Sequence, residues 1–250
     1  MFKINKRYID IFEKYIHKGE STPFTLGTLF VCMFCFLILI ISTFTQITFS
    51  HPWFVYTPEQ GFVYTLKSVT YNPQFPIIIF ITYILYKSYS ILVYILYLLT
   101  GFFLYPIFAY GGGLNYVQNY FFGYLLGFIF AIIITGTVIK KNNSVKSKII
   151  AAVLGILSIH ITGFIYAIFL AMFDFISFNL ILPIANVVTV SKILYDITFA
   201  IILILVAPYA KNVLWVCMRP ISSRKKKLKN SDKRNKIISD DIYQHGQYNN

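Results

Sequence analysis

Long runs of apolar residues, separated by short polar or charged segments, dominate the chain. The first run covers residues 23–49, carries no charge, and exceeds the roughly 20 residues that cross a bilayer. Further apolar runs cover about 71–86, 89–109, 121–139, 149–173 and 187–210. The pattern predicts an all-α integral membrane protein with six transmembrane helices, contained in a membrane domain over residues 23–218.

The segments between the runs are short and chemically distinct. Lys87 and Ser88 separate the second run from the third. Three consecutive glycines at 111–113 end the third, because glycine is a poor helix former. The remaining connections are a polar, aromatic stretch at 51–72, a basic turn at 140–148 and a short link at 174–186.

The positive charges follow the same division. Of the 22 Lys and Arg residues, all but Lys67 and Lys192 lie in segments that six spans would place on one side. Basic residues gather on the cytoplasmic side, so both termini are predicted to be cytoplasmic. Residues 1–22 then form an amphipathic cytoplasmic segment, and residues 219–250 form a basic, disordered tail that contacts anionic lipid.

Composition narrows the functional classes. Hydrophobic residues make up 57% of the chain and charged residues 12%, about half the share in soluble domains. The net charge of +13 is explained by the cytoplasmic segments and does not require nucleic acid. No spacing of residues indicates a metal site, a nucleotide site or a catalytic centre, so we expect neither cofactor nor enzymatic activity. Cys32 and Cys35, inside the first run, are interpreted as packing residues.

Two ionisable residues stand within the predicted spans. Lys192 and Asp196 are four residues apart and therefore share one helix face. Such residues cost about 2.5–3.5 kcal/mol each in a bilayer, which favours a functional reason for them. They are candidates for binding a ligand with a carboxylate and hydrogen-bonding groups. Alternatively, they pair with each other, or Lys192 extends to the membrane interface.

The triple-glycine segment is the second candidate site. Glycine lets backbone amides approach a small ligand and permits positive φ angles, although the segment also fits a plain tight turn. Asn115, Tyr116 and Asn119 follow it and offer polar contacts.

Small residues at helical spacing are assigned to helix packing. His160 is interpreted as a hydrogen-bonded structural residue, with a ligand or proton-relay role left open. The small residues are Gly123, Gly127, Gly163, Ala167 and Ala171.

The order of motifs between residues 71 and 128 resembles the BioY family, the biotin-binding S components of energy-coupling-factor (ECF) transporters. The matching blocks are a Pro-containing entry to the second helix, YLLTG at 97–101, PIFA at 106–109, GGG at 111–113 and GYLLGF at 123–128. The resemblance covers roughly residues 70–210, and the family also has six helices.

The resemblance implies a multi-pass protein of the bacterial inner membrane that binds biotin from the outside. Its partners would be membrane lipid, an ECF T subunit and a pair of ATPases. Position by position, it implies that the ligand is bound by Gly112, Gly113, Tyr116, Asn119, Tyr124, Lys192 and Asp196. Lys192 is the choice for the ligand carboxylate, and Asp196, Asn119 and Tyr116 are candidates for the ureido group.

The chain departs from the family pattern in its sixth helix. The family shows an Asp followed by a Lys three residues later, whereas here Lys192 comes first and Asp196 follows four residues later. The individual roles of the two residues therefore stay open. Two other functional interpretations also stay open: an S component for another vitamin or precursor, and a membrane enzyme or scaffold.

Overall fold

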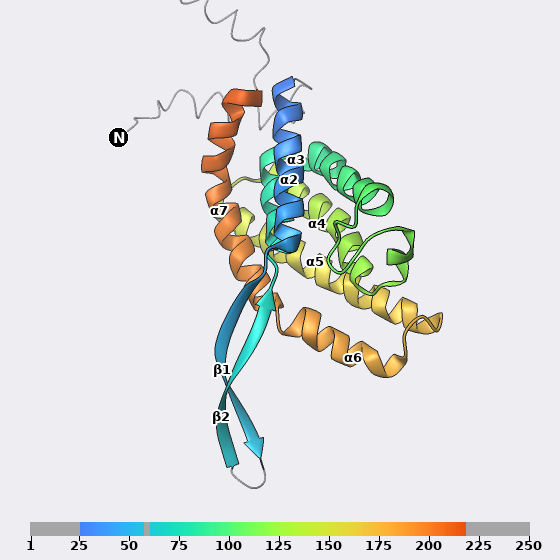
Figure 1. The fold of residues 1–250 in the computed structure, drawn as a ribbon. Helices are drawn as coiled ribbons and strands as arrows, with labels where there is room; N and C mark the ends of the chain where they lie inside the picture. Colours follow the sequence, from blue (N-terminus) through green and yellow to red (C-terminus); the bar gives the residue numbers. More distant parts are fainter. Residues whose placement is uncertain (1–25, 58–60, 219–250) are drawn as a thin grey trace, which may run out of the picture.

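The structure is a computed structural model that describes residues 26–57 and 61–218. Figure 1 shows a bundle of helices with a β-hairpin that projects from one end. The predicted N-terminal segment, residues 1–22, and the predicted tail, residues 219–250, lie outside the described residues.

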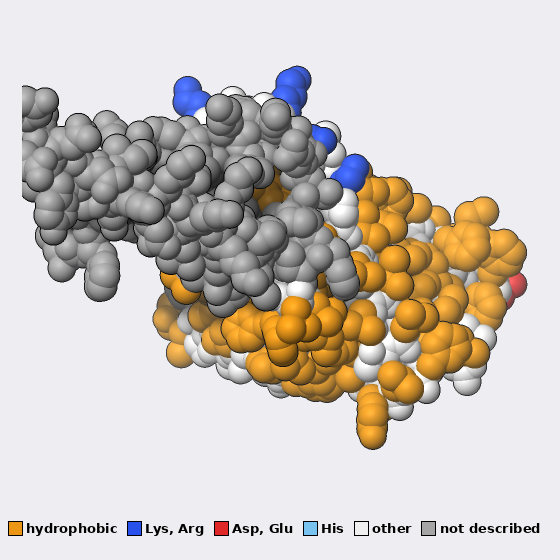
Figure 2. Space-filling view, turned by 90° about the horizontal axis from the view of Figure 1, so that it is seen from above, with side chains coloured by type: hydrophobic (Ala, Val, Ile, Leu, Met, Phe, Trp, Pro, Cys, Tyr) orange, Lys and Arg blue, Asp and Glu red, His pale blue; other side chains and the backbone are white. Residues whose placement is uncertain are grey.

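Five helical segments among the described residues are long and apolar enough to cross a membrane. They are built on α2 (Leu26–Phe44), α3 (Gln74–Leu99), α4 (Phe121–Lys141), α5 (Val145–Met172) and α7 (Ile193–Met218). Apolar side chains such as Phe30 and Ile41 stand exposed on α2, and hydrophobic side chains cover much of the face drawn in Figure 2. An apolar surface of this extent fits contact with lipid, so the helical membrane fold predicted from the sequence is confirmed.

The segment Gln74–Leu104 is divided by a break at Tyr86, which has φ 60° and ψ 173°. Its 31 residues would extend about 46 Å as one straight helix, longer than the roughly 30 Å hydrocarbon core. At the break, the buried Lys211 donates from Nζ to the carbonyl oxygen of Tyr83 at 2.8 Å. In an unbroken helix that carbonyl would accept from Lys87. The break falls where Lys87 predicted a turn. Lys211 lies inside α7, just beyond residue 210, where the predicted sixth span ended.

A β-hairpin occupies the stretch that the sequence described only as a polar, aromatic connection. Strands β1 (Ile47–Thr57) and β2 (Gly61–Tyr71) pair antiparallel, from Ile47 opposite Tyr71 to Thr57 opposite Gly61. Many of their residues are aromatic or β-branched, which favours strands. The hairpin is an addition to the predicted all-α class, and it brings Tyr71 to the edge of the helix bundle.

Small residues allow α4 and α5 to pack closely, as predicted. A Cβ on Gly127 would come within 2.7 Å of the Ile159 Cα, and one on Gly163 within 2.5 Å of the Tyr124 ring. Both glycines are therefore required at a close helix contact. This packing fixes α4, and with it Tyr124, against the middle of α5.

The connection between α5 and α7 is more structured than predicted. Short turns of helix, α6 (Ile181–Ile184) and η4 (Ala185–Val190), run crosswise to α7 (Figure 1). The predicted sixth span began at residue 187, but α7 begins at Ile193. Lys192 thus immediately precedes α7, and Asp196 lies in its first turn.

Candidate substrate-binding site

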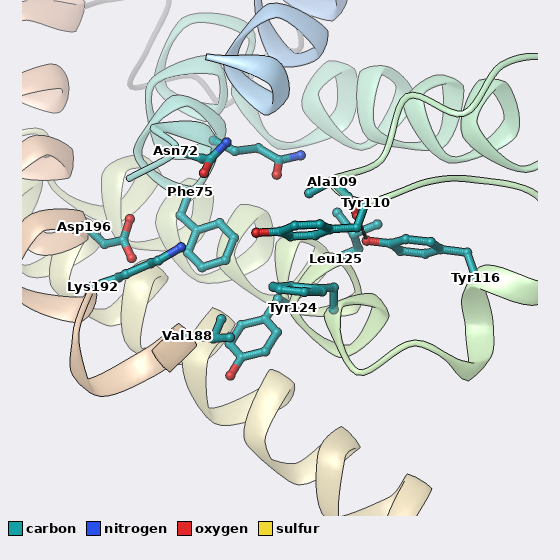
Figure 3. Close-up of a pocket in the computed structure, with 12 residues that line it drawn as sticks. Asn72, Phe75, Ala109, Tyr110, Tyr116, Tyr124, Leu125, Val188, Lys192 and Asp196 are labelled. Carbon is teal, nitrogen blue, oxygen red and sulfur yellow. Dashed lines mark hydrogen bonds between the residues drawn. The ribbon is translucent and has the colours of Figure 1, made fainter. Parts of the chain in front are cut away.

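A pocket lies at the meeting point of four parts of the chain (Figure 3). They are the start of α3, the loop around residues 111–113 (the glycine loop), the start of α4 and the start of α7. Its cavity volume is about 50 Å³. Aromatic and aliphatic side chains form most of its wall, with a few polar groups among them. The lining residues are Asn72, Gln74, Phe75, Ala109, Tyr110, Tyr116, Phe121, Tyr124, Leu125, Val188, Lys192 and Asp196. An apolar pocket with few convergent polar groups is typical of a small-molecule site.

The glycine loop is held by its own backbone. Phe108 and Gly111 exchange hydrogen bonds of 3.0 and 3.1 Å, and Gly113 donates to the carbonyl of Gly101 at 2.8 Å. Gly113 has φ +79°, and a Cβ on Gly112 would come within 2.5 Å of the Pro106 Cα. The glycines therefore meet a conformational and steric requirement of the loop.

Tyr116 supports the loop from beneath. Its hydroxyl donates to the carbonyl of Ala109 at 2.6 Å, and its ring packs on Phe108 with centroids 4.8 Å apart. Burial raises the pKa of the Tyr116 hydroxyl, and neighbouring tyrosines raise it further. The hydroxyl therefore remains a neutral donor at physiological pH, and this donor is already used by the loop.

Lys192 enters the pocket from the side opposite the glycine loop (Figure 3). Its ammonium has no hydrogen-bond or ion-pair partner among residues 26–57 and 61–218, although the nearby carboxyl group of Asp196 interacts with it electrostatically. A half-buried cation beside aromatic rings is a ready partner for an anion. The sequence left open that Lys192 and Asp196 form an ion pair with each other, and the structure does not contain that ion pair.

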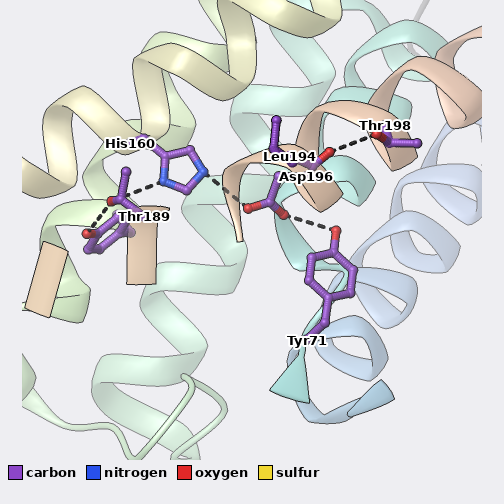
Figure 4. Close-up of polar contacts among 7 residues, drawn as sticks. Tyr71, His160, Thr189, Leu194, Asp196 and Thr198 are labelled. Atoms are coloured by element: carbon purple, nitrogen blue, oxygen red, sulfur yellow. Dashed lines mark hydrogen bonds and ion pairs between the residues drawn. The ribbon is translucent and has the colours of Figure 1, made fainter. Parts of the chain in front are cut away.

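Asp196 is 2% exposed, and its two carboxyl oxygens contact side chains from different elements. Tyr71 donates from its hydroxyl to Oδ1 at 3.0 Å, and His160 Nε2 lies 3.1 Å from Oδ2 (Figure 4). His160 Nδ1 lies 3.3 Å from the Thr189 hydroxyl, which lies 2.9 Å from the hydroxyl of Tyr124. The hydrogen-bonded reading of His160 is confirmed, and its partner is a residue that lines the pocket.

Four of the seven candidate residues meet at the pocket: Tyr116, Tyr124, Lys192 and Asp196. The other three, Gly112, Gly113 and Asn119, are not among its lining residues. Asn119 instead accepts from the backbone N–H of Phe121 at 3.0 Å and so caps the start of α4. These three residues shape the loop that carries Tyr110 and Tyr116.

Sequence reasoning missed several lining residues. Asn72 and Gln74 flank the proline that precedes α3. Polar residues at the start of a membrane span are a signal that could have identified them as pocket residues. Tyr110 has φ 71°, a conformation uncommon outside glycine, and its ring stacks on Phe121 at 4.6 Å. Nothing in the sequence indicated that Tyr71, 125 residues before Asp196, would contact it.

The fold and the pocket define a multi-pass membrane protein with a pocket at one end of its helix bundle. The family model of BioY matches residues 28–215, so this chain belongs to the BioY family. A search of curated proteins found no match.

Among solved structures, the chain is similar to one described as the S-component for biotin from an ECF-type ABC transporter. The two share 17% sequence identity with a TM-score of 0.55, over 76% of this chain and 95% of the other. At this identity the likeness concerns the fold.

Proposed function

We propose that this protein is the substrate-specific component of a biotin uptake transporter, which binds biotin from the extracytoplasmic side. Membership of the BioY family supports this role. The observation that carries it is the ammonium of Lys192, which has no ion-pair partner in the described part of the chain and lies in an aromatic pocket beside Asp196. Biotin combines one carboxylate, a ureido group and an apolar bicycle, and these features match that pocket. The protein acts as a transport component and not as an enzyme.

The ligand is held by groups of three kinds. Lys192 binds the carboxylate, and Asp196 accepts from a ureido N–H. Phe75 and Tyr124, whose rings are stacked with centroids 5.9 Å apart, contact the bicycle. Tyr116 contributes through its ring, because its hydroxyl is engaged by the loop.

Gly112, Gly113 and Asn119 act on the ligand through the shape of the loop. The cavity of about 50 Å³ is smaller than the roughly 300 Å³ or more of typical ligand pockets. Biotin entry therefore requires the loop to move, and Tyr110, at 74% exposed, is the most exposed side chain that lines the pocket. Its movement away from Phe121 would enlarge the pocket toward the outside.

Six spans with both termini in the cytoplasm fit this role. If the two arms of α3 on either side of the break at Tyr86 each cross the membrane, the five helical segments make six crossings. The pocket lies at the N-terminal end of α4, and Lys140 and Lys141 lie at its other end. By the positive-inside rule the lysine end is cytoplasmic, so the pocket opens outward.

Transport against a gradient requires an energy source, which an ECF T subunit and its ATPases would supply. No group of His, Cys, Asp or Glu suited to a metal occurs within residues 26–57 and 61–218. Co-purification of a T subunit from the native membrane tests this partnership. Loss of uptake when the ATPases are deleted is the expected companion result.

Titration calorimetry of the purified full chain with biotin tests the central proposal. We expect binding in the nanomolar to micromolar range, and its absence would reject biotin as the ligand. The order of Lys192 and Asp196, reversed from the family pattern, favours a second candidate, an S component for another vitamin or precursor. Competition by a panel of vitamins distinguishes the two. A scaffold predicts no small-ligand binding at all.

A further inference from the structure

His160 lies in α5 and does not line the pocket, yet it contacts Asp196, which does. Through Thr189 it is also connected to Tyr124, another lining residue. Its ring is 2% exposed, and its two nitrogens face residues from different elements, Asp196 of α7 and Thr189 of η4. Phe75 of α3 packs edge-on against the ring, with centroids 5.5 Å apart. The orientation of the imidazole is therefore determined on three sides.

The hydrogen bonds around His160 are consistent with a single direction of donation. If Asp196 is ionised, His160 must donate to it from Nε2–H, and Nδ1 of the neutral ring must then accept. Thr189 donates to Nδ1, which leaves its oxygen to accept from the hydroxyl of Tyr124. The chain thus runs from Tyr124 through Thr189 and His160 to Asp196, with every group satisfied.

We propose that His160 is a positioning residue that keeps Asp196 an acceptor aimed at the ligand and ties η4 to the pocket wall. This inference deepens the proposed function and rests on it. Tyr71 occupies Oδ1 and His160 occupies Oδ2, so each carboxylate oxygen has one protein donor and retains a lone pair for the ligand. Thr189 links η4 to both Tyr124 and His160, so the same series of hydrogen bonds fixes η4, the segment that precedes Lys192, against the pocket wall.

Two substitutions separate positioning from simple packing. His160→Gln can keep both interactions, because its amide N–H donates to Asp196 and its oxygen accepts from Thr189. His160→Phe fills the space and removes both hydrogen bonds. Thr162→Val, on the same helix, is the matched control, because within the described segments the Thr162 hydroxyl bonds only the carbonyl of Ser158.

Biotin affinity is measured by calorimetry on the purified full chain. We expect His160→Gln to bind biotin nearly as tightly as wild type, and His160→Phe to bind at least about tenfold more weakly. Wild-type-like binding by His160→Phe, or a loss in His160→Gln as large as that in His160→Phe, would overturn the inference while leaving the proposed function intact.

A second readout does not depend on the ligand. Nitrogen-15 spectra of the histidine-labelled protein, with His160→Gln used for assignment, report which ring nitrogen carries the proton. We expect the Nε2–H tautomer at pH 8. Finding Nδ1–H would overturn the inference even if biotin proved not to be the ligand, and a failure of wild-type binding alone would count only against the proposed function.

Discussion

Replacing Lys192 with methionine removes one positive charge from the pocket and keeps a side chain of similar length. Because the Lys192 ammonium has no partner among residues 26–57 and 61–218, its loss leaves no protein acceptor unsatisfied. The fold should therefore be unaffected, and the cost should appear in ligand binding. A charge-assisted hydrogen bond contributes about 1.5–3 kcal/mol, which corresponds to a roughly 10- to 150-fold weaker Kd for biotin.

The assay compares two ligands that differ only at the end facing Lys192. Calorimetry with biotin should show the full loss, whereas biotin amide, which has no carboxylate, should bind wild type and Lys192→Met nearly equally. Lys141→Met, an exposed lysine at the other end of α4, is the matched control and should bind like wild type.

An unchanged Kd for biotin in Lys192→Met would refute the assignment of the carboxylate to this residue. Equal losses for biotin and its amide would do so as well, because they would point to a change in pocket shape. A lowered thermal midpoint in detergent would show that Lys192 stabilises the fold through a contact that the structure does not contain. Each outcome therefore has a separate meaning.

Three further substitutions test the scaffold around the pocket, with thermal unfolding in detergent as the measurement. Gly112→Ala places a Cβ 2.5 Å from the Pro106 Cα, so both the thermal midpoint and biotin affinity should fall; retained affinity would exclude a role for loop shape. Tyr97→Phe leaves the carbonyl of Ile107 without its donor, at a cost of about 1–3 kcal/mol, and a neutral result would contradict that bond. Phe128→Ala opens a cavity in the buried core and should cost about 3–5 kcal/mol, so an unshifted midpoint would show that the core collapses around it.

Local chemistry was enough to predict the membrane class. An uncharged run such as residues 149–173 forms a helix in lipid whatever its neighbours are, because each backbone group must be satisfied within the segment. The turn at Lys87 was predicted on similar grounds, since a charged residue interrupts an apolar run. The small residues Gly127 and Gly163 indicated close packing because spacing alone puts them on helix faces.

The hairpin illustrates the limit of such reasoning. Residues 51–72 carry aromatic and β-branched side chains, but strand pairing depends on which segment lies opposite, and sequence pattern alone did not determine that. The same limit applied to η4, whose crosswise path replaced the predicted start of the sixth helix.

The sequence by itself identified Lys192 and Asp196 as charged residues of a predicted span, because ionisable groups are rare and costly there. The burial of Lys211 within α7 and the partners of Asp196 were decided only by the tertiary structure. Asp196 contacts Tyr71 and His160, which lie 125 and 36 residues away along the chain, while Lys192 has no hydrogen-bond or ion-pair partner among the described residues. Pairing of this kind is set by how helices pack in three dimensions, and no periodicity of the chain encodes it.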